Sequence, residues 1–172
     1  MKDPVLRTAR SKILTLEQLL TVRTHLRATG ATLVFTNGCF DILHPGHVSY
    51  LEFARAQGDA LCVALNSDAS VKRNKGPLRP VNPEADRCLV LAGLECVDYV
   101  VLFDDDEPAP LIDRVIPDVL VKGADWAHYV SGRETVEAHG GKVVLATFVD
   151  GQSTTNTITR IADMLKAGAA HA

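Results

Sequence analysis

The sequence of 172 residues has no run of Lys or Arg and no continuous apolar segment at its amino terminus. Its net charge is −3, whereas proteins that bind the phosphate backbone of nucleic acids usually carry a basic face. Residues 1–16 include basic side chains but no apolar stretch that suits a signal peptide or a membrane span. These absences argue against a nucleic-acid partner and a membrane anchor, and we expect a cytoplasmic protein.

Paired cysteines of the kind that bind zinc or exchange disulfides are also missing. None of the four cysteines belongs to a C-x-x-C pair, so neither a zinc knuckle nor a thioredoxin-type motif is indicated. Cys62 lies in an apolar run and is expected to be a small core residue with a reduced thiol. The length suits one domain over residues 1–172, with no internal repeat or low-complexity stretch.

Short apolar segments alternate with helical segments along the chain. After a loose leader at residues 1–12, we expect a helix at 13–30, with Thr15 and Gln18 as its capping box and Gly30 at its end. The pattern then predicts strands at 31–37, 60–66, 99–103, 118–122 and 142–148, and helices at 46–57, 84–95, 109–116, 132–140 and 155–166. This is an α/β pattern, typical of a Rossmann-like, doubly wound, parallel five-stranded sheet with helices on both faces. Such folds bind ligands beyond the carboxyl ends of their strands.

Two histidines follow the first long strand, where a helix is expected to begin. Gly38 permits a close approach of the backbone to a phosphate, and Pro45 suits the first turn of a helix. The helix N-terminus attracts anions, and His44 and His47 lie on the same side of one turn beside it. A polar loop with a chance pair of histidines and a zinc pair are alternatives, but no third zinc ligand is evident nearby. We predict that this segment binds a triphosphate, through residues Asn37, Gly38, Cys39, Phe40, Gly46 and the two histidines.

A cationic stretch follows the second long strand. Lys72, Lys75 and Arg79 occur close together, beside Gly76, Pro77 and Pro80, which indicate a loop over the strand ends. Such side chains on a surface helix would usually be solvated charge. Beside a phosphate site they suit triphosphate chemistry, and we predict that Lys72 and Lys75 contact the phosphates.

Two further clusters follow the next strands. Lys122 and Gly123 end one strand and precede Trp126, which could stack on a base or sugar or merely cover the edge of the core. Ser153 and Thr154, with Thr155 beside them, could be plain N-caps of the last helix, but the same geometry presents hydroxyl and N–H groups to a phosphate.

An acidic run at residues 104–108 follows the third strand. It could indicate a metal site, but carboxylates also favour helix N-termini. We interpret the run as a solvated loop that caps the following helix.

These motifs together resemble a known superfamily. "TNGCFDILHPGH", "NSDASVKRNKG", "VKGADW" and "DGQSTTN" look like the nucleotidyltransferases with the H-x-G-H signature, over roughly residues 14–162. The longer stretches "SDASVKRNKGPLRPVN" and "DGQSTTN" resemble the branch of heptose 1-phosphate adenylyltransferases that make ADP-heptose. In many organisms that branch is half of a bifunctional protein with a sugar kinase. The sequence has no Walker-type loop, in agreement with a stand-alone, non-kinase chain.

The resemblance implies roles for individual residues. His44 and His47 would stabilise the transition state, the backbone at Cys39 and Phe40 would approach the α-phosphate, and Lys75, with Lys72, would hold the phosphates. Ser153 and Thr154 would bind the triphosphate from the last helix. The acceptor sugar is expected near Asp41, with Arg79, Asp125 and Trp126 as further contacts. Asp125 lies in a segment that resembles "GDDW" of related cytidylyltransferases, although Ala124 precedes it here.

The reaction implied is adenylyl transfer from ATP to D-glycero-D-manno-heptose 1-phosphate, giving ADP-heptose and pyrophosphate for the inner core of lipopolysaccharide. Mg²⁺ is expected on the triphosphate, with no protein ligand named for it. A homodimer is compatible with the sequence. A cytidylyltransferase acting on glycerol 3-phosphate or a similar alcohol phosphate, and a non-catalytic nucleotide-binding module, are the alternatives, because base and acceptor are set by side loops rather than by the fold.

Overall fold

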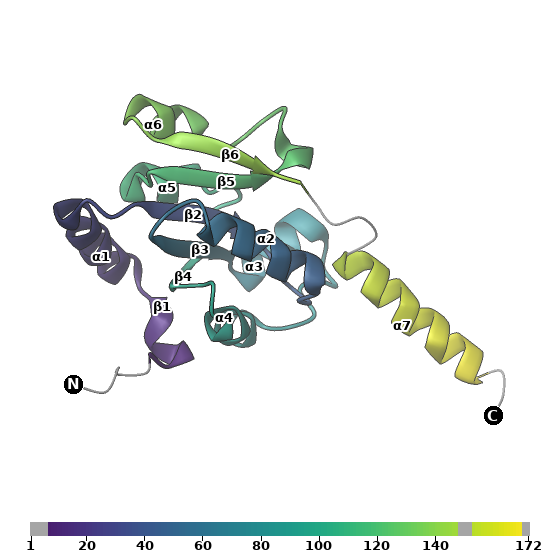
Figure 1. Ribbon diagram of the computed structural model, residues 1–172. Coiled ribbons are helices and arrows are strands. Elements are labelled where there is room, and N and C mark those ends of the chain that lie inside the picture. Colours follow the sequence, from purple (N-terminus) through teal and green to yellow (C-terminus); the bar gives the residue numbers. More distant parts are fainter. Residues whose placement is uncertain (1–6, 148–152, 170–172) are drawn as a thin grey trace.

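The sheet of the protein has six strands, all parallel, in the order β1-β4-β3-β2-β5-β6 (Figure 1). The computed structural model describes residues 7–147 and 153–169. The strands are β1 Ile13–Leu14, β2 Leu33–Gly38, β3 Ala60–Asn66, β4 Tyr99–Phe103, β5 Val119–Gly123 and β6 Lys142–Ala146. The predicted α/β class and parallel sheet are therefore confirmed, whereas the predicted number of five strands is wrong.

Helices cover both faces of this sheet, as a doubly wound fold requires. The helices are α1 Leu16–Thr29, α2 Pro45–Arg55, α3 Asp68–Lys75, α4 Glu84–Gly93, α5 Ala109–Val115, α6 Arg133–Ala138 and α7 Thr154–Ala169, with 3-10 turns η1 Ala9–Lys12 and η2 Ala124–Trp126. Helices α2 and α4 pack on one face, and α1, α5 and α6 pack on the other. Helix α7 extends away from the sheet (Figure 1).

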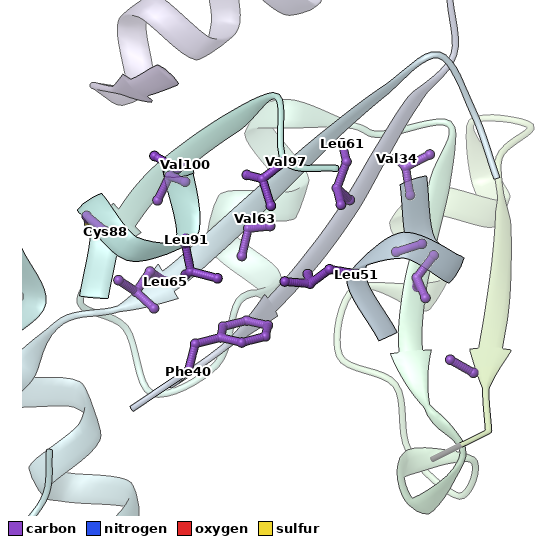
Figure 2. Packing of buried hydrophobic residues seen from close by; sticks show 14 of the residues in the cluster. Val34, Phe40, Leu51, Leu61, Val63, Leu65, Cys88, Leu91, Val97 and Val100 are labelled. Atoms are coloured by element: carbon purple, nitrogen blue, oxygen red, sulfur yellow. The ribbon is translucent and has the colours of Figure 1, made fainter. Parts of the chain in front are cut away.

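Strand β3 shows how the sequence builds two cores. All seven of its residues are buried, because β3 lies between two other strands and beneath helices on both sides. Alternate side chains point to opposite faces, so Leu61, Val63 and Leu65 join the α2–α4 core, whereas Cys62 joins the other core. Figure 2 shows the first of these clusters, with Leu51 of α2 packed among the strand residues.

The additional strand is β1, which the sequence pattern assigned to a helix. The capping box of Thr15 and Gln18 is present as predicted, and it begins α1 at Leu16. The two preceding residues are therefore outside the helix and pair with Val100 and Val101 of β4. This short strand covers the edge of β4 that would otherwise expose unpaired backbone groups.

Two other expectations about local structure are wrong. Residues 68–75, expected in a loop, form helix α3, because the side chain of Ser67 caps its first turn and the glycine and proline residues follow its last turn. The expected leader forms the turn η1 from residue 9 onward, where Lys12 donates a hydrogen bond to the carbonyl of Leu94 at 3.0 Å. Residues 1–6 of the leader and Phe148 of the last predicted strand lie outside the described residues.

None of the helices in the described part of the chain combines the length and the apolar character that crossing a bilayer needs.

Arg87 joins three segments that come from different parts of the chain. Its guanidinium is fully buried and donates to the carbonyls of Cys39 (2.7 Å) and Asn82 (3.0 Å) and to the carboxylate of Asp68 (2.7 Å). These partners lie after β2, before α4 and at the start of α3. A single buried side chain thus holds in place the segments that follow the central strands.

We predict that Arg87→Met lowers the free energy of unfolding by about 3 kcal/mol, because it leaves buried carbonyl groups without donors and Asp68 without its counter-ion. Urea denaturation measures this change. Arg133→Met is the matched control, since Arg133 pairs with Glu137 on the surface and should change the free energy by only about 0.5 kcal/mol. Equal losses in the two variants would contradict the proposed role of Arg87.

Candidate active site

The candidate site begins where the order of the sheet reverses. From β2 the chain builds β3 and β4 on one side and then returns to place β5 on the other side of β2. The carboxyl ends of β2 and β5 therefore form the switch point at which open α/β sheets bind ligands. Lys122 of β5 donates a hydrogen bond from Nζ to Oδ1 of Asn37 of β2, so the predicted residues of these two strands meet.

Lys122 is almost completely buried at this switch point. Burial lowers the pKa of its ammonium group to about 8, although Asp125 and Glu107 act in the opposite direction. Its Nζ also lies 5.9 Å from the centre of the Trp126 ring. The amine is therefore placed where it can contact a ligand, and it carries its charge less firmly than a surface lysine does.

The loop after β2 has a geometry that the sequence did not reveal. Phe40, not Gly38, is the residue with a left-handed backbone, at φ 42°. Its ring folds back over Gly38, where a Cβ atom would lie 3.0 Å from the ring. Gly38 is thus required by lack of space rather than by its own φ angle, and the backbone of this loop stays open to a ligand.

His44 and His47 stand together at the N-terminus of α2. His44 is the N-cap, Pro45 is the first helical residue, and the two imidazole rings stack with centroids 3.8 Å apart. Both Nδ1 atoms are buried without a hydrogen-bond partner among the described residues. Burial, together with the neighbouring His44, lowers the pKa of His47 to about 4, and burial also lowers the pKa of His44. Both rings are therefore neutral near pH 7 in the free protein.

Helix α3 brings only one of its two predicted lysines to the site. Lys75, the last residue of α3, lines both cavities that border the switch point. Lys72 is exposed one turn earlier and is absent from the described lining of both cavities. The difference follows from position along the helix, since Lys75 is the last residue of α3 and Lys72 lies one turn before it.

Helix α7 contributes the serine–threonine turn. Ser153 accepts a hydrogen bond at Oγ from the backbone N–H of Asn156 (3.0 Å), so it caps α7 as one sequence interpretation expected. Thr154 donates from Oγ1 to the carbonyl of Ile42 at 3.3 Å, which places the start of α7 against the segment between β2 and α2. Residues 150–152 of the same motif lie outside the described residues.

Two adjoining cavities occupy the carboxyl edge of the sheet. The first, which we call the histidine cavity, has a volume of about 370 Å³, and the second, the wide cavity, about 540 Å³. The histidine cavity is lined by Asn37, Gly38, Cys39, Phe40, His44, Gly46, His47, Tyr50, Lys75, Lys122, Gly123, Asp125, Trp126, Ser153 and Thr154. Both cavities include Asn37, Gly38, Cys39, Phe40, His47, Lys75, Lys122, Trp126 and Thr154. All the predicted site residues except Lys72 line at least one of the two cavities.

The wide cavity contains the predicted acceptor residues Asp41 and Arg79, already bonded to each other. The buried carboxylate of Asp41 accepts from Arg79 Nε (2.5 Å) and from the backbone N–H groups of Val81 and Asn82. Burial alone would raise the pKa of Asp41, but these donors lower it overall. The Nη groups of Arg79 have no hydrogen-bond acceptor among the described residues, so the arginine, rather than Asp41, is available to a ligand.

Several residues that line these cavities were missed by the sequence patterns. Tyr50 of α2 bonds through its hydroxyl to Thr36 (2.7 Å) and donates to the carbonyl of Val121 (3.1 Å), which ties α2 to β2 and β5. The wide cavity adds Asn66, Asn74, Asp106, Glu107, Pro108, Tyr129 and Ser131. For residues 104–108, the sequence did offer one signal of a place in the site, namely their position directly after a strand. Their interpretation as a cap of α5 is wrong, because Pro108 is its N-cap and no side chain caps it.

A protein site for magnesium would need several oxygen ligands close together. Within residues 7–147 and 153–169, no group of three or more His, Cys, Asp or Glu side chains could hold a metal ion. The charged side chains that line the cavities include the cations Lys75, Lys122 and Arg79.

The buried histidines predict how stability depends on pH. Because the pKa of His47 is about 4 in the folded chain and 6.5 ordinarily, the unfolded chain binds the proton more readily. The free energy of unfolding should therefore fall as the pH falls from 6.5 toward 4. His47→Gln should reduce this acid sensitivity, as measured by urea denaturation across that range. His139→Gln, on the surface of α6, is the control and should leave the profile of the natural chain unchanged.

Comparison with known proteins agrees with this geometry. The family described as cytidylyltransferase-like matches residues 35–159. The chain is 54% identical to the bifunctional protein HldE of Syntrophotalea carbinolica over 92% of its own length and 32% of that protein. It is 55% identical to HldE of Pectobacterium carotovorum over 87% of its length and 31% of the relative. The chain thus spans about a third of the length of these curated relatives.

Solved structures show the same architecture. A lipopolysaccharide core biosynthesis protein from Thermoplasma volcanium matches with a TM-score of 0.58 and 28% identity, over 72% of this chain and all of that one. A pantoate-beta-alanine ligase from Francisella tularensis shares the fold, with a TM-score of 0.57 and 16% identity, over 78% of this chain and 66% of the ligase. Because the family match extends from β2 into α7, the chain belongs to the cytidylyltransferase-like family.

Proposed function

We propose that the protein is an adenylyltransferase that converts ATP and D-glycero-D-manno-heptose 1-phosphate into ADP-heptose and pyrophosphate. The observation that carries the proposal is the convergence of His44, His47, Lys75, Lys122 and Thr154, from the four elements α2, α3, β5 and α7, on one cavity at the switch point. The choice of acceptor is supported by the motifs that resemble the heptose branch and by the likeness to HldE. The reaction belongs in the cytoplasm, and its product would serve the inner core of lipopolysaccharide.

In this reaction an oxygen of the sugar phosphate attacks the α-phosphorus of ATP in line, and the bond to pyrophosphate breaks. The attacking phosphate is already ionised near neutral pH, so the protein does not need a strong general base. Its contributions are positioning of the two substrates and stabilisation of the charge that develops on the five-coordinate phosphorus. The two cavities suit this task because they meet at a common wall that includes Lys75, Lys122 and His47.

The residues of that wall act in different ways. The neutral imidazoles of His44 and His47 donate hydrogen bonds, and the first turn of α2 adds N–H groups and the positive end of the helix dipole. Lys75 supplies a mobile positive charge from the end of α3, and Lys122 supplies a fixed one from β5. Lys72 faces solvent and has no place in this scheme. Magnesium would bind with ATP, through phosphate oxygens and water, and would screen the charge of the triphosphate.

We predict that His47→Ala lowers kcat by on the order of a hundredfold or more, because a hydrogen-bond donor to the reacting phosphate is lost. Steady-state release of pyrophosphate measures the rate, and circular dichroism checks that the variant is folded. His139→Ala should behave like the natural chain. Near-normal turnover of the folded His47→Ala variant would contradict the scheme. Comparing ATP with CTP in the same assay tests the base, and a preference for CTP would reject adenylyl transfer.

We also predict that kcat/KM falls as the pH rises through about 8, where the ammonium of Lys122 loses its proton in the free protein. Lys122→Arg keeps its charge at all these pH values and should move the alkaline decline to higher pH, even if the maximal rate is lower. Lys72→Arg is the matched control and should keep the natural profile. An unchanged decline in Lys122→Arg would show that Lys122 is not the titrating group.

A further inference from the structure

The acidic segment at residues 104–107 is held in a defined position by α3. Ser67 donates to the carboxylate of Asp104, and Ser70 donates to the carbonyl of Asp105 at 3.0 Å. Arg73 pairs with the carboxylate of Asp106 at 2.6 Å. The carboxylates of Asp104 and Asp106 are thus engaged by residues of α3 and its cap, and Asp105 does not line the wide cavity.

Glu107 ends the segment and belongs to a different set of contacts. Its Oε2 atom accepts hydrogen bonds from the hydroxyl of Tyr129 (2.7 Å) and from that of Ser131 (2.9 Å). These bonds, with a smaller contribution from Lys122, lower the pKa of Glu107, so the carboxylate is charged. Its second oxygen, Oε1, has no donor among the described residues. The carboxylate is therefore oriented by one oxygen and has the other available.

The lining of the wide cavity consequently combines groups of two kinds. Arg79, Lys75 and Lys122 supply cationic groups, and the Nη groups of Arg79 lack an acceptor within the described chain. Glu107, with Tyr129 and Ser131 behind it, supplies an oriented acceptor of hydrogen bonds. A ligand that matches both kinds of group must carry an anionic group together with hydroxyl groups that can donate. Phosphorylated polyhydroxy compounds have this form, whereas phosphates of apolar alcohols do not.

We infer that Glu107, held by Tyr129 and Ser131, forms the subsite that receives hydroxyl groups of the acceptor while Arg79 receives its phosphate. The inference rests on the proposed function, which makes the sugar phosphate the acceptor of the adenylyl group. The subsite itself is a statement about binding of that acceptor and not about its turnover. It makes Glu107 a specificity-determining residue, which favours sugar phosphates over acceptors without hydroxyl groups. Asp41 is then a positioning residue, because its carboxylate is occupied in orienting Arg79 and the backbone beside it.

The test compares Glu107→Gln with Asp105→Asn. Both remove one negative charge from the same segment, but only Glu107 lines the wide cavity. In Glu107→Gln, the amide oxygen can still accept hydrogen bonds from Tyr129 and Ser131. The amide NH2 group then takes the place of the available oxygen, and it donates a hydrogen bond instead of accepting one. Calorimetric titration with heptose 1-phosphate, in the presence of α,β-methylene ATP, measures binding without turnover. We expect Glu107→Gln to weaken binding on the order of tenfold and Asp105→Asn to bind like the natural chain.

Monodeoxy analogues of heptose 1-phosphate extend the test to the hydroxyl group. The analogue that lacks the hydroxyl bound by Glu107 should bind the natural chain about tenfold more weakly than heptose 1-phosphate does. The Glu107→Gln variant should bind this analogue and heptose 1-phosphate with nearly equal affinity, because the change in the ligand and the change in the protein remove the same interaction. Pyrophosphate release is measured on the same proteins. In Glu107→Gln the KM for the acceptor should rise, while the KM for ATP should stay unchanged.

The outcomes separate the subsite from the function. If the natural chain turns over heptose 1-phosphate but Glu107→Gln and Asp105→Asn bind it equally well, the subsite is rejected and the proposed function stands. If the sugar phosphate binds and depends on Glu107 but no pyrophosphate is released, the function is rejected and the subsite stands. Failure of the natural chain to bind any sugar phosphate would overturn both.

Discussion

The arrangement of the site depends on one buried cation, the guanidinium of Arg87. It bonds to the backbone after β2, to the backbone before α4 and to the first turn of α3. Each of these segments leaves the sheet at its carboxyl edge, where a loop would otherwise have to be ordered by the ligand. Asp41 makes a comparable set of bonds to Arg79, Val81 and Asn82. Two buried charges therefore order the loops in advance, and catalysis by positioning requires such order.

The electrostatics of the empty site follow from the same burial. The imidazole of His47 is neutral because the folded chain disfavours its charged form, and Lys122 titrates near pH 8 for the same reason. A triphosphate would raise both pKa values, since a nearby anion favours the protonated form, and Lys122 would then keep its charge above pH 8. Positive charge would then be concentrated where and when the substrate brings negative charge. The protein does not have to stabilise several like charges in a buried site before ATP arrives.

The sequence predicted the parts of the molecule that rest on local signals. Apolar runs identified β2 to β6, and the motif around His44 and His47 identified the start of α2 after β2, because a helix N-terminus after a strand has a recognisable spacing. It did not predict β1, whose two residues gain their conformation only by pairing with β4. It also did not predict that α3 leaves Lys72 outside the two cavities while Lys75 lines both, since this helix depends on a cap at Ser67 rather than on composition.

Glu107 shows a more general reason why acceptor sites are hard to predict. Its orientation comes from Tyr129 and Ser131, more than twenty residues later in the chain, and from contacts of α3 with the segment that precedes it. No spacing rule joins these residues; only the fold does.

The division between the two cavities explains how one fold can serve different acceptors. The histidine cavity is built on β2, α2 and β5 at the switch point, with the start of α7 beside them. The part of the wide cavity that contains Glu107, Tyr129 and Ser131 is built from the segments after β4 and β5, which are connections at the surface. Changes at residues such as Glu107 or Tyr129 would therefore alter the acceptor without disturbing the histidines or the buried bonds of Arg87. Under the proposed function, the chemistry at phosphorus would stay fixed while the acceptor varies, because different elements of the structure would hold the two substrates.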